Sequence, residues 1–405
     1  MACVARTKLT GTTFYSVSET HPGFTLFAPM TDNKVWLVNM VGKVIHSWTM
    51  PYKPGSHAEL LPNGNLLYAA RMENGPLPEF KGAGGKLMEV DKNGKLVWEY
   101  NEPYHHHTFK RLENGNTLIV KWAKVPAAIA KFVTGGVAGS ERKGEMWGDV
   151  LEEITKEGKV VWTWKSWEHL DPVVDKICPI CSRAEWTHIT SVDVTKDGNI
   201  LLNCSKTGSI IVVNKKTGKI DVRWGNGELS HPGQASVIKN GNFIVFDCGR
   251  HTQGEGQGFS RAIEIDSKTL KPFWGYEEDP PHYLFSSSMG SCQRLPNGNT
   301  LIVEGTTGRM MEVNPKNCMT WEYISPYRGT EDKNWYGYIF RAFRYGLDYA
   351  GIRKLYGLEK DWIMWDDLES NIKAAKLMAG EKQEEPKAAM SQEDLIRSRL
   401  EPLGY

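Results

Sequence analysis

The sequence has almost no net charge, no long apolar run and few cysteines, and each absence excludes a class of protein. Its 49 Lys and Arg residues are balanced by 48 Asp and Glu residues, which argues against a nucleic-acid or anionic-membrane partner bound through bulk charge. No window offers the ~18 consecutive apolar residues of a membrane span, and the first residues lack the apolar run of a secretory signal. We therefore expect a cytoplasmic protein without a membrane partner.

Cysteine is scarce and scattered, so a disulfide-stabilised scaffold is not indicated. The chain has seven cysteines, an odd number, and Cys178 and Cys181 are the one close pair. A single Cys-x2-Cys pair supplies at most half of a zinc site, and a redox bridge is a second alternative. We interpret the pair as an incidental feature of a loop, and we predict no metal or other cofactor.

Glycine and tryptophan, in contrast, are abundant. The 405 residues include 40 Gly and 15 Trp, and 11% of them are aromatic. The length allows one large repeat fold or two to three ordinary domains. Many tight turns combined with many large rings are typical of all-β repeat proteins.

Two short signatures alternate along the chain. The first is a hairpin in which Asn-Gly-Asn or Asp-Gly-Asn separates two apolar runs, because Asn and Gly tolerate the positive φ of such turns. It occurs at 61–67, 112–118, 196–200, 238–243 and 295–301. The second is a strand, a turn and a strand that ends in Trp; it occurs at 35–48, 87–98, 151–162 and 210–224, with degraded copies at 262–274 and 310–321.

The spacing of the repeats predicts the fold. Successive terminal tryptophans are about 50 residues apart, or about 63 where insertions are indicated near 123–143 and 169–184; about 40–50 residues make a four-stranded propeller blade. We predict an all-β fold, a six-bladed β-propeller, over residues 12–325. Residues 326–405 lack the repeat and have helical spacing at 364–379. We predict that they form a mainly helical C-terminal extension that packs on the propeller or mediates a homo-oligomer.

Histidines recur at one point of successive repeats. His57, the run 105–107, His188 and His231 each precede one of the first four hairpins, whereas the fifth has a serine-rich segment. In a propeller the inner strands all begin at one face, so we expect these side chains to converge. A metal site is the competing explanation, but no acidic residue accompanies the histidines at a fixed spacing. Arg250 and His251 form a second polar pair that would reach the same face.

Four segments resemble, in the same order, those of the arylsulfotransferase family, the donor-dependent type built on a six-bladed β-propeller. They are His106-His107 ahead of the second hairpin, Trp186-Thr-His188-Ile-Thr-Ser191, His231 ahead of the fourth hairpin with Asp247-Cys-Gly, and Ser260-Arg261-Ala-Ile-Glu264. Trp147-Gly148-Asp149 also fits. The resemblance covers roughly residues 30–325.

The resemblance implies transfer of a sulfuryl group from a phenolic sulfate to an acceptor phenol through a sulfohistidine. His231 matches the family's nucleophile, and His107 and His188 match its supporting histidines. Lys206 stands where the family has a catalytic Arg, while Thr108 and Pro232 each replace an Asp. The residues that we expect to contact the substrate are His57, His106, Trp186, Arg250 and Arg261.

The chemistry of the residues themselves is compatible with this reaction. A neutral imidazole can attack sulfur, an imidazolium can protonate the leaving phenoxide, and a lysine can hold an anionic group. We therefore predict an enzyme with a small aromatic or anionic substrate. A hydrolase or lyase that uses the same histidines as acid and base is an alternative, and a non-catalytic propeller scaffold is another.

Overall fold

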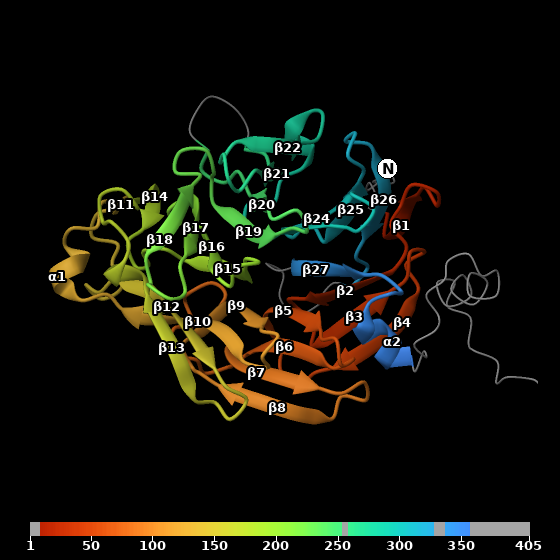
Figure 1. Ribbon diagram of the computed structural model, residues 1–405, viewed down its shortest axis with the longest axis horizontal. Coiled ribbons are helices and arrows are strands. Elements are labelled where there is room, and N and C mark those ends of the chain that lie inside the picture. Colours follow the sequence, from red (N-terminus) through yellow and green to blue (C-terminus); the bar gives the residue numbers. More distant parts are fainter. Residues whose placement is uncertain (1–8, 253–257, 328–336, 357–405) are drawn as a thin grey trace, which may run out of the picture.

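The computed structural model describes residues 9–252, 258–327 and 337–356. Six β-sheets are arranged around a common centre (Figure 1). Each has four strands, and the last gains a fifth at its outer edge. The chain is thus a six-bladed β-propeller, as its sequence predicts. The described helices are two short ones, α1 (Ala127–Ala130) and α2 (Ala350–Tyr356), and neither has the length and hydrophobicity that crossing a membrane requires.

The blades are numbered here in chain order, with strands given from the centre outwards. Blade 1 is β27 (Ile339–Tyr345), β2 (Phe24–Pro29), β3 (Lys34–Val38) and β4 (Val44–Thr49); blade 2 is β5 (Pro54–Leu60), β6 (Leu66–Arg71), β7 (Gly85–Val90) and β8 (Leu96–Asn101); blade 3 is β9 (His105–Arg111), β10 (Thr117–Lys124), β12 (Trp147–Ile154) and β13 (Val160–Lys165). Blade 4 is β15 (Ile189–Val194), β16 (Ile200–Cys204), β17 (Ser209–Val213) and β18 (Ile220–Trp224); blade 5 is β19 (Pro232–Val237), β20 (Phe243–Asp247), β21 (Arg261–Ile265) and β22 (Pro272–Tyr276); blade 6 is β23 (Ser291–Arg294), β24 (Thr300–Glu304), β25 (Arg309–Val313), β26 (Met319–Ile324) and β1 (Gly11–Tyr15).

Both ends of the described chain close the ring. Strand β1 pairs antiparallel with β26 at the outer edge of blade 6, and β27 pairs antiparallel with β2 as the innermost strand of blade 1. Strand β27 falls within 326–405, the range expected to form a helical extension, so the predicted boundary at residue 325 is too early. The remainder of that extension from residue 357, including the helical spacing at 364–379, lies outside the described residues.

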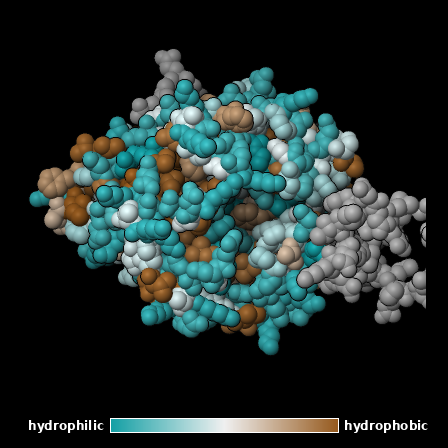
Figure 2. Space-filling view, viewed as in Figure 1, coloured by the Kyte–Doolittle hydropathy of each residue, from teal (hydrophilic) through white to brown (hydrophobic). Residues whose placement is uncertain are grey.

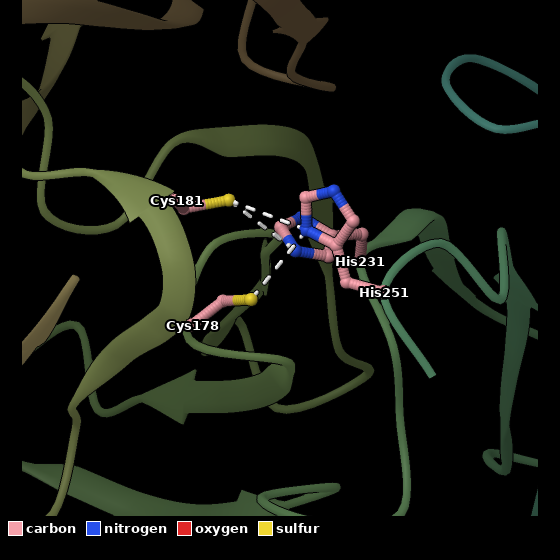
Figure 3. A group of neighbouring side chains, drawn as sticks. All are labelled: Cys178, Cys181, His231 and His251. Carbon is pink, nitrogen blue, oxygen red and sulfur yellow. Dashed lines mark hydrogen bonds between the residues drawn. The ribbon is translucent and has the colours of Figure 1, made fainter. Parts of the chain in front are cut away.

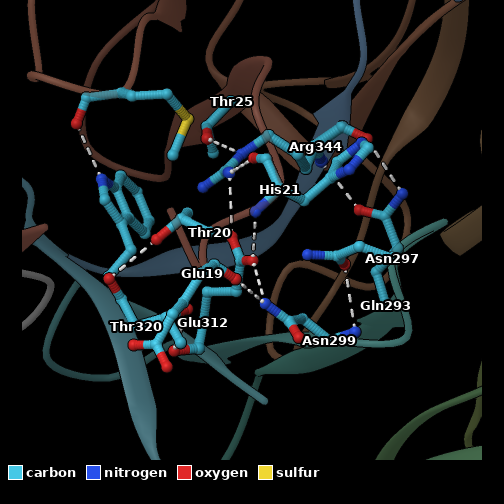
Figure 4. Close-up of polar contacts among 12 residues, drawn as sticks. Glu19, Thr20, His21, Thr25, Gln293, Asn297, Asn299, Glu312, Thr320 and Arg344 are labelled. Carbon is cyan, nitrogen blue, oxygen red and sulfur yellow. Dashed lines mark hydrogen bonds and ion pairs between the residues drawn. The ribbon is translucent and has the colours of Figure 1, made fainter. Parts of the chain in front are cut away.

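A buried ion pair joins blade 6 to blade 1 (Figure 4). Arg344 Nη1 in β27 lies 3.0 Å from Glu312 Oε2 in β25, and both side chains are completely buried. Arg344 also donates from Nε to Thr25 Oγ1, and Glu312 also accepts from the Asn299 amide. Because the pair is supported by these additional hydrogen bonds, the closure tolerates two charges in the core.

Hydrogen bonds connect the two sequence signatures. The glycines of the five hairpins all have positive φ, between 78° and 93°, as the turn chemistry predicts. In four blades the side-chain amide of the second Asn donates to a glutamate on the third strand; the pairs are Asn65 with Glu89, Asn116 with Glu153, Asn242 with Glu264, and Asn299 with Glu312. The hairpin of each of these blades is thereby fixed to its third strand.

The terminal tryptophans connect neighbouring blades. In four of them the indole N–H donates to a backbone carbonyl in the next blade around the ring; the pairs are Trp48 with Asp91, Trp98 with Lys156, Trp162 with Lys215, and Trp321 with Met40. Apolar clusters fill the space between adjacent blades. The recurring Trp is therefore a contact between blades.

The two expected insertions pack against each other. Strand β11 (Gly135–Val137) in the first pairs in parallel with β14 (Ile177–Ser182) in the second, and the backbone N–H of Cys178 donates to the carbonyl of Lys206 in blade 4. Figure 2 shows hydrophobic residues gathered at the side where Figure 1 places α1, β11 and β14. The exposed apolar residues of the insertions are Phe132, Val137, Val173, Val174 and Ile180.

Candidate active site

Three histidines occupy equivalent places in consecutive blades. His107, His188 and His231 have positive φ of 51°, 55° and 56°, and they stand at or just before β9, β15 and β19, the inner strands of blades 3, 4 and 5. Pairing of each strand with its neighbour is irregular at this point, and such irregularities re-aim side chains. Histidine is several-fold enriched in this backbone region. Met289 takes the same backbone conformation in blade 6, with φ of 70°.

A buried carboxylate sets the orientation of the histidines in blade 3. Asp149 Oδ1 in β12 lies 2.9 Å from His106 Nε2, and His106 Nδ1 lies 2.8 Å from His107 Nδ1. A carboxylate only accepts, so when the His106 ring has a single proton, this proton faces Asp149 from Nε2 and the ring accepts on Nδ1 from His107. The Nε2 of His107 then keeps its lone pair. The order Asp149, His106, His107 is thus a relay that fixes two tautomers.

His188 lies next to this relay and has its own carboxylate. The ring centres of His107 and His188 are 4.4 Å apart, and His188 Nδ1 is hydrogen-bonded to Glu185 Oε2. Burial on its own raises the pKa of Glu185, but His188 and Lys206 outweigh it and lower this pKa to about 2. Lys206 Nζ lies 3.7 Å from Glu185 Oε1. An ionised Glu185 therefore holds His188 and Lys206 together.

His231 lines a cavity of about 410 Å³ between blades 4 and 5. Lys206, Arg261 and Phe259 line the same cavity, so two cations and an aromatic ring share it with the imidazole. Burial, followed by His251, Arg250 and other nearby positive groups, lowers the pKa of His231 to about 3. The cavity thus combines a neutral imidazole with groups that attract an anion.

The structure places the other expected substrate contacts in different surroundings. Trp186 is completely buried, and its indole N–H donates to the carbonyl of Asp175, so it is a core residue rather than a substrate contact. His57 is stacked on Phe109 with ring centres 4.4 Å apart, and it is not among the residues that line the cavity. His106 is buried within the relay. Arg250 donates from Nε to His251 Nε2 at 3.1 Å.

Carboxylates accompany the histidines after all. Glu59 lies 3.4 Å from His57 Nε2, and Asp149 and Glu185 contact His106 and His188. Apart from the resemblance, which includes Asp149, the sequence does not link these carboxylates to the histidines, because they follow no common spacing. Asp149 comes from a third strand and Glu185 from an insertion, so only the folded chain brings them to the imidazoles.

The insertion also brings two thiols to His231. The side chains of Cys178 and Cys181 on β14 point toward the rings of His231 and His251 (Figure 3). The sulfur of Cys181 lies 3.6 Å from His231 Nε2. In the sequence this cysteine pair looks incidental because a whole blade separates it from His231. The structure instead makes it part of the same site.

One known protein family matches most of the propeller. The family described as arylsulfotransferase (ASST) matches residues 57–326, more than half of the chain. The chain belongs to this family. The matched span contains every histidine of blades 2 to 5 described above, together with Lys206. No curated protein matches the arylsulfotransferase-family chain at a significant level.

Solved structures share the fold at low identity. A Bacteroides caccae protein of unknown function matches with a TM-score of 0.52 and 13% identity, over 80% of this chain and 98% of that one. A catalytically inactive variant of virginiamycin B lyase from Staphylococcus aureus, solved with quinupristin, has a TM-score of 0.44 and 10% identity, over 79% and 90%. Kuenenia stuttgartiensis hydrazine synthase has a TM-score of 0.43 and 11% identity, over 76% and 81%. The first similarity supports the propeller fold, and the other two carry no argument.

Proposed function

We propose that this family member transfers a sulfuryl group from a phenolic sulfate to an acceptor phenol, with His231 as the nucleophile. The observation that carries the proposal is the shared cavity: His231 lines it with Lys206 and Arg261, in a chain whose family membership covers all three residues. An anionic sulfate ester attracts cations, and Phe259 in the same wall suits an aromatic ring.

The reaction proceeds in two displacements. A lone pair of the His231 imidazole forms an N–S bond while the aryl O–S bond breaks, and the electron pair of that bond leaves on the phenoxide oxygen. His188 donates the proton that completes the phenol. An acceptor phenol then returns its proton to the same acid and attacks sulfur, the N–S bond breaks, and the imidazole recovers its lone pair.

The cations have a defined role in both displacements. Negative charge on the sulfuryl oxygens needs donors that are already in place, and Lys206 is held by Glu185 and by the carbonyl of Ser182 at 3.2 Å. Lysine is a point charge without the planar fork of arginine. Arg261 supplies a fork in the same cavity, although Asp247 at 3.2 Å neutralises part of its charge.

Steady-state kinetics with a chromogenic aryl sulfate test the proposal. We expect phenol release to depend on the acceptor phenol with parallel-line, ping-pong kinetics, and to fall below detection in His231→Ala. The exposed His282 offers a matched control, because His282→Ala removes an imidazole outside the cavity and leaves turnover intact. Release that is independent of any acceptor would instead indicate a hydrolase, and absence of release from a folded protein would contradict an enzymatic role toward aryl sulfates.

A further inference from the structure

Four potential metal ligands from three separate segments meet at His231. Cys178 and Cys181 come from β14 in the second insertion, His231 precedes β19, and His251 follows β20. Their donor atoms all lie within 4.8 Å of one another (Figure 3). In the part of the chain that the structure describes, this is the one group of three or more such residues placed to hold a metal ion.

The distances match a tetrahedral metal site. The sulfur of Cys181 lies 3.6 Å from His231 Nε2 and 3.6 Å from His251 Nδ1, and the sulfur of Cys178 lies 3.6 Å from the same His251 nitrogen. In a tetrahedron with Zn–S near ~2.3 Å and Zn–N near ~2.05 Å, neighbouring sulfur and nitrogen atoms are about 3.6 Å apart. Three of the six separations between donor atoms thus have the length expected for a tetrahedron, and all six lie within 4.8 Å.

Hydrogen bonds alone do not explain this arrangement. His251 Nδ1 faces two sulfurs at once, and Cys181 faces two ring nitrogens. One nitrogen has either one proton or one lone pair, and one thiol has a single proton. A cation at the centre satisfies all four atoms together, since each donates one lone pair to it.

The two thiols become thiolates through the metal itself. A bound divalent cation deprotonates a coordinating thiol outright. Two thiolates and two imidazoles in a tetrahedron select zinc over calcium or magnesium, which prefer oxygen ligands.

We propose that Cys178, Cys181, His231 and His251 form a zinc site. Four protein ligands leave no open position, as in structural zinc sites. The metal would join the second insertion to blade 5, and it would close one wall of the cavity that His231 lines.

Zinc and the sulfuryl group then compete for His231, a consequence that rests on the function proposed above. When Nε2 is bound to zinc, the ring proton sits on Nδ1, so the ring has no lone pair for sulfur. The zinc-loaded protein is therefore unable to form a sulfohistidine at His231, whereas the zinc-free protein is able to form it.

Arg250 tunes the affinity of the site. Its Nε donates to His251 Nε2 at 3.1 Å, but ligation through Nδ1 places the ring proton on Nε2, where it opposes that donor. Arg250 must turn away when the metal binds. In Arg250→Gln an amide oxygen can accept this proton, and such supporting contacts change metal affinity by about 10–100-fold. We expect Arg250→Gln to bind zinc about tenfold more tightly.

Metal content tests the site without reference to activity. The purified full chain is stripped with a chelator, titrated with zinc and weighed by native mass spectrometry; we expect one zinc per chain. Cobalt in its place should give the intense visible absorption of a tetrahedral thiolate complex. Cys181→Ser should lower zinc affinity by at least about 100-fold, whereas Cys318→Ser, which removes an exposed cysteine outside the site, should not.

Three results would each overturn the zinc site. They are equal zinc affinity in Cys181→Ser and wild type, no zinc in the stripped and reloaded wild type, and a Cys178–Cys181 disulfide in the freshly purified protein. Because the cobalt spectrum is measured on the wild type, misfolding of a variant does not decide the outcome.

A paired labelling measurement separates the two proposals. Zinc-free and zinc-loaded wild type are incubated with the aryl sulfate and weighed intact. Label in the zinc-free form alone supports both proposals. Bound zinc with label in neither form leaves the metal site standing and contradicts sulfuryl transfer. Equal labelling at His231 in both forms shows that the metal does not occupy His231, and it overturns the site.

Discussion

The substitution Asp149→Asn should reverse the proton relay of blade 3 while preserving its shape. Asp149 is 1% exposed, and its Oδ2 accepts from the hydroxyl of Thr187 and from the backbone N–H of Ile189 at 3.1 Å. Those two donors hold the amide oxygen of the introduced asparagine on their side, so its NH₂ group faces His106 Nε2. His106 must then accept on Nε2 and donate from Nδ1, and the proton of His107 moves to Nε2.

The expected loss of stability follows from the hydrogen bonds that Asp149 accepts from Thr187 and Ile189. Two hydrogen bonds change from a charged to a neutral acceptor, and the difference between these classes is about 1 kcal/mol each, so we expect roughly 2 kcal/mol less stability. His107 packs against His188, the proposed acid, with ring centres 4.4 Å apart, and a misplaced proton beside an acid–base group costs about 10²–10⁴ in kcat. We therefore expect kcat with an aryl sulfate to fall in that range, with KM changed less than about threefold.

The assay combines kinetics with nitrogen NMR of the histidines, which reports the protonated ring nitrogen directly. The wild type should show His107 protonated on Nδ1, and Asp149→Asn should show it protonated on Nε2. Glu264→Gln is a matched control, because Glu264 is also buried and accepts from Asn242 and Arg294 far from the relay. A folded Asp149→Asn protein in which His107 keeps its proton on Nδ1 and kcat falls less than about tenfold would refute the relay.

Three further predictions concern closure, pH and anion binding. Arg344→Met leaves Glu312 charged and unpaired in the core, so urea unfolding should show a loss of about 3–5 kcal/mol; a loss below about 1 kcal/mol would contradict the closing role. Burial, partly offset by Glu59, lowers the pKa of His57 to about 4. The folded protein therefore becomes less stable as pH falls from about 6.5 to 4, because the unfolded chain binds a proton at His57 that the folded protein does not. The loss at pH 4 is roughly 3 kcal/mol. In thermal melts, the melting temperature of His57→Gln should depend less steeply on pH in that window than the melting temperature of the wild type. An unchanged pH dependence would contradict this prediction. In the phenol-release assay, Lys206→Ala should lower kcat/KM for aryl sulfates by about 10–10³-fold. Lys206→Arg keeps the positive charge and should lower it much less. Equal losses in the two variants would show that the charge of Lys206 does not contribute to the reaction.

Much of the fold could be predicted because each blade repeats the same local chemistry. The Asn-Gly-Asn turns require positive φ, and the terminal tryptophans recur at the length of a blade. The number of blades and their order along the chain therefore follow from the spacing of these two signatures. The closing strand β27 was missed because its partners lie at the other end of the chain. One signal does point to it: six tryptophan signatures stand against five hairpins, and the blade without a hairpin is the one whose inner strand comes from residues 339–345.

The sequence predicts only those residues of the candidate site that recur at one position in successive blades. His107, His188 and His231 recur at one place in successive blades, so symmetry alone predicts that they lie at one face. Asp149 lies on the third strand of blade 3, and Cys178, Cys181 and Glu185 lie in or next to the second insertion, so no repeated spacing links these residues to the histidines. Trp186 is the reverse case. It lies two residues from His188 in the sequence and is expected there to contact the substrate, but its side chain packs in the core.

The most direct test of the central claim is to locate the sulfuryl group on the protein. Zinc-free wild type is incubated with an aryl sulfate in the absence of acceptor, quenched under alkaline conditions that preserve an N–S bond, digested and mapped by tandem mass spectrometry. We predict one sulfuryl group, on the peptide that contains His231, which disappears when an acceptor phenol is added. Phenol release without any label, or a label confined to His107 or His188, would contradict the assignment of His231 as the nucleophile.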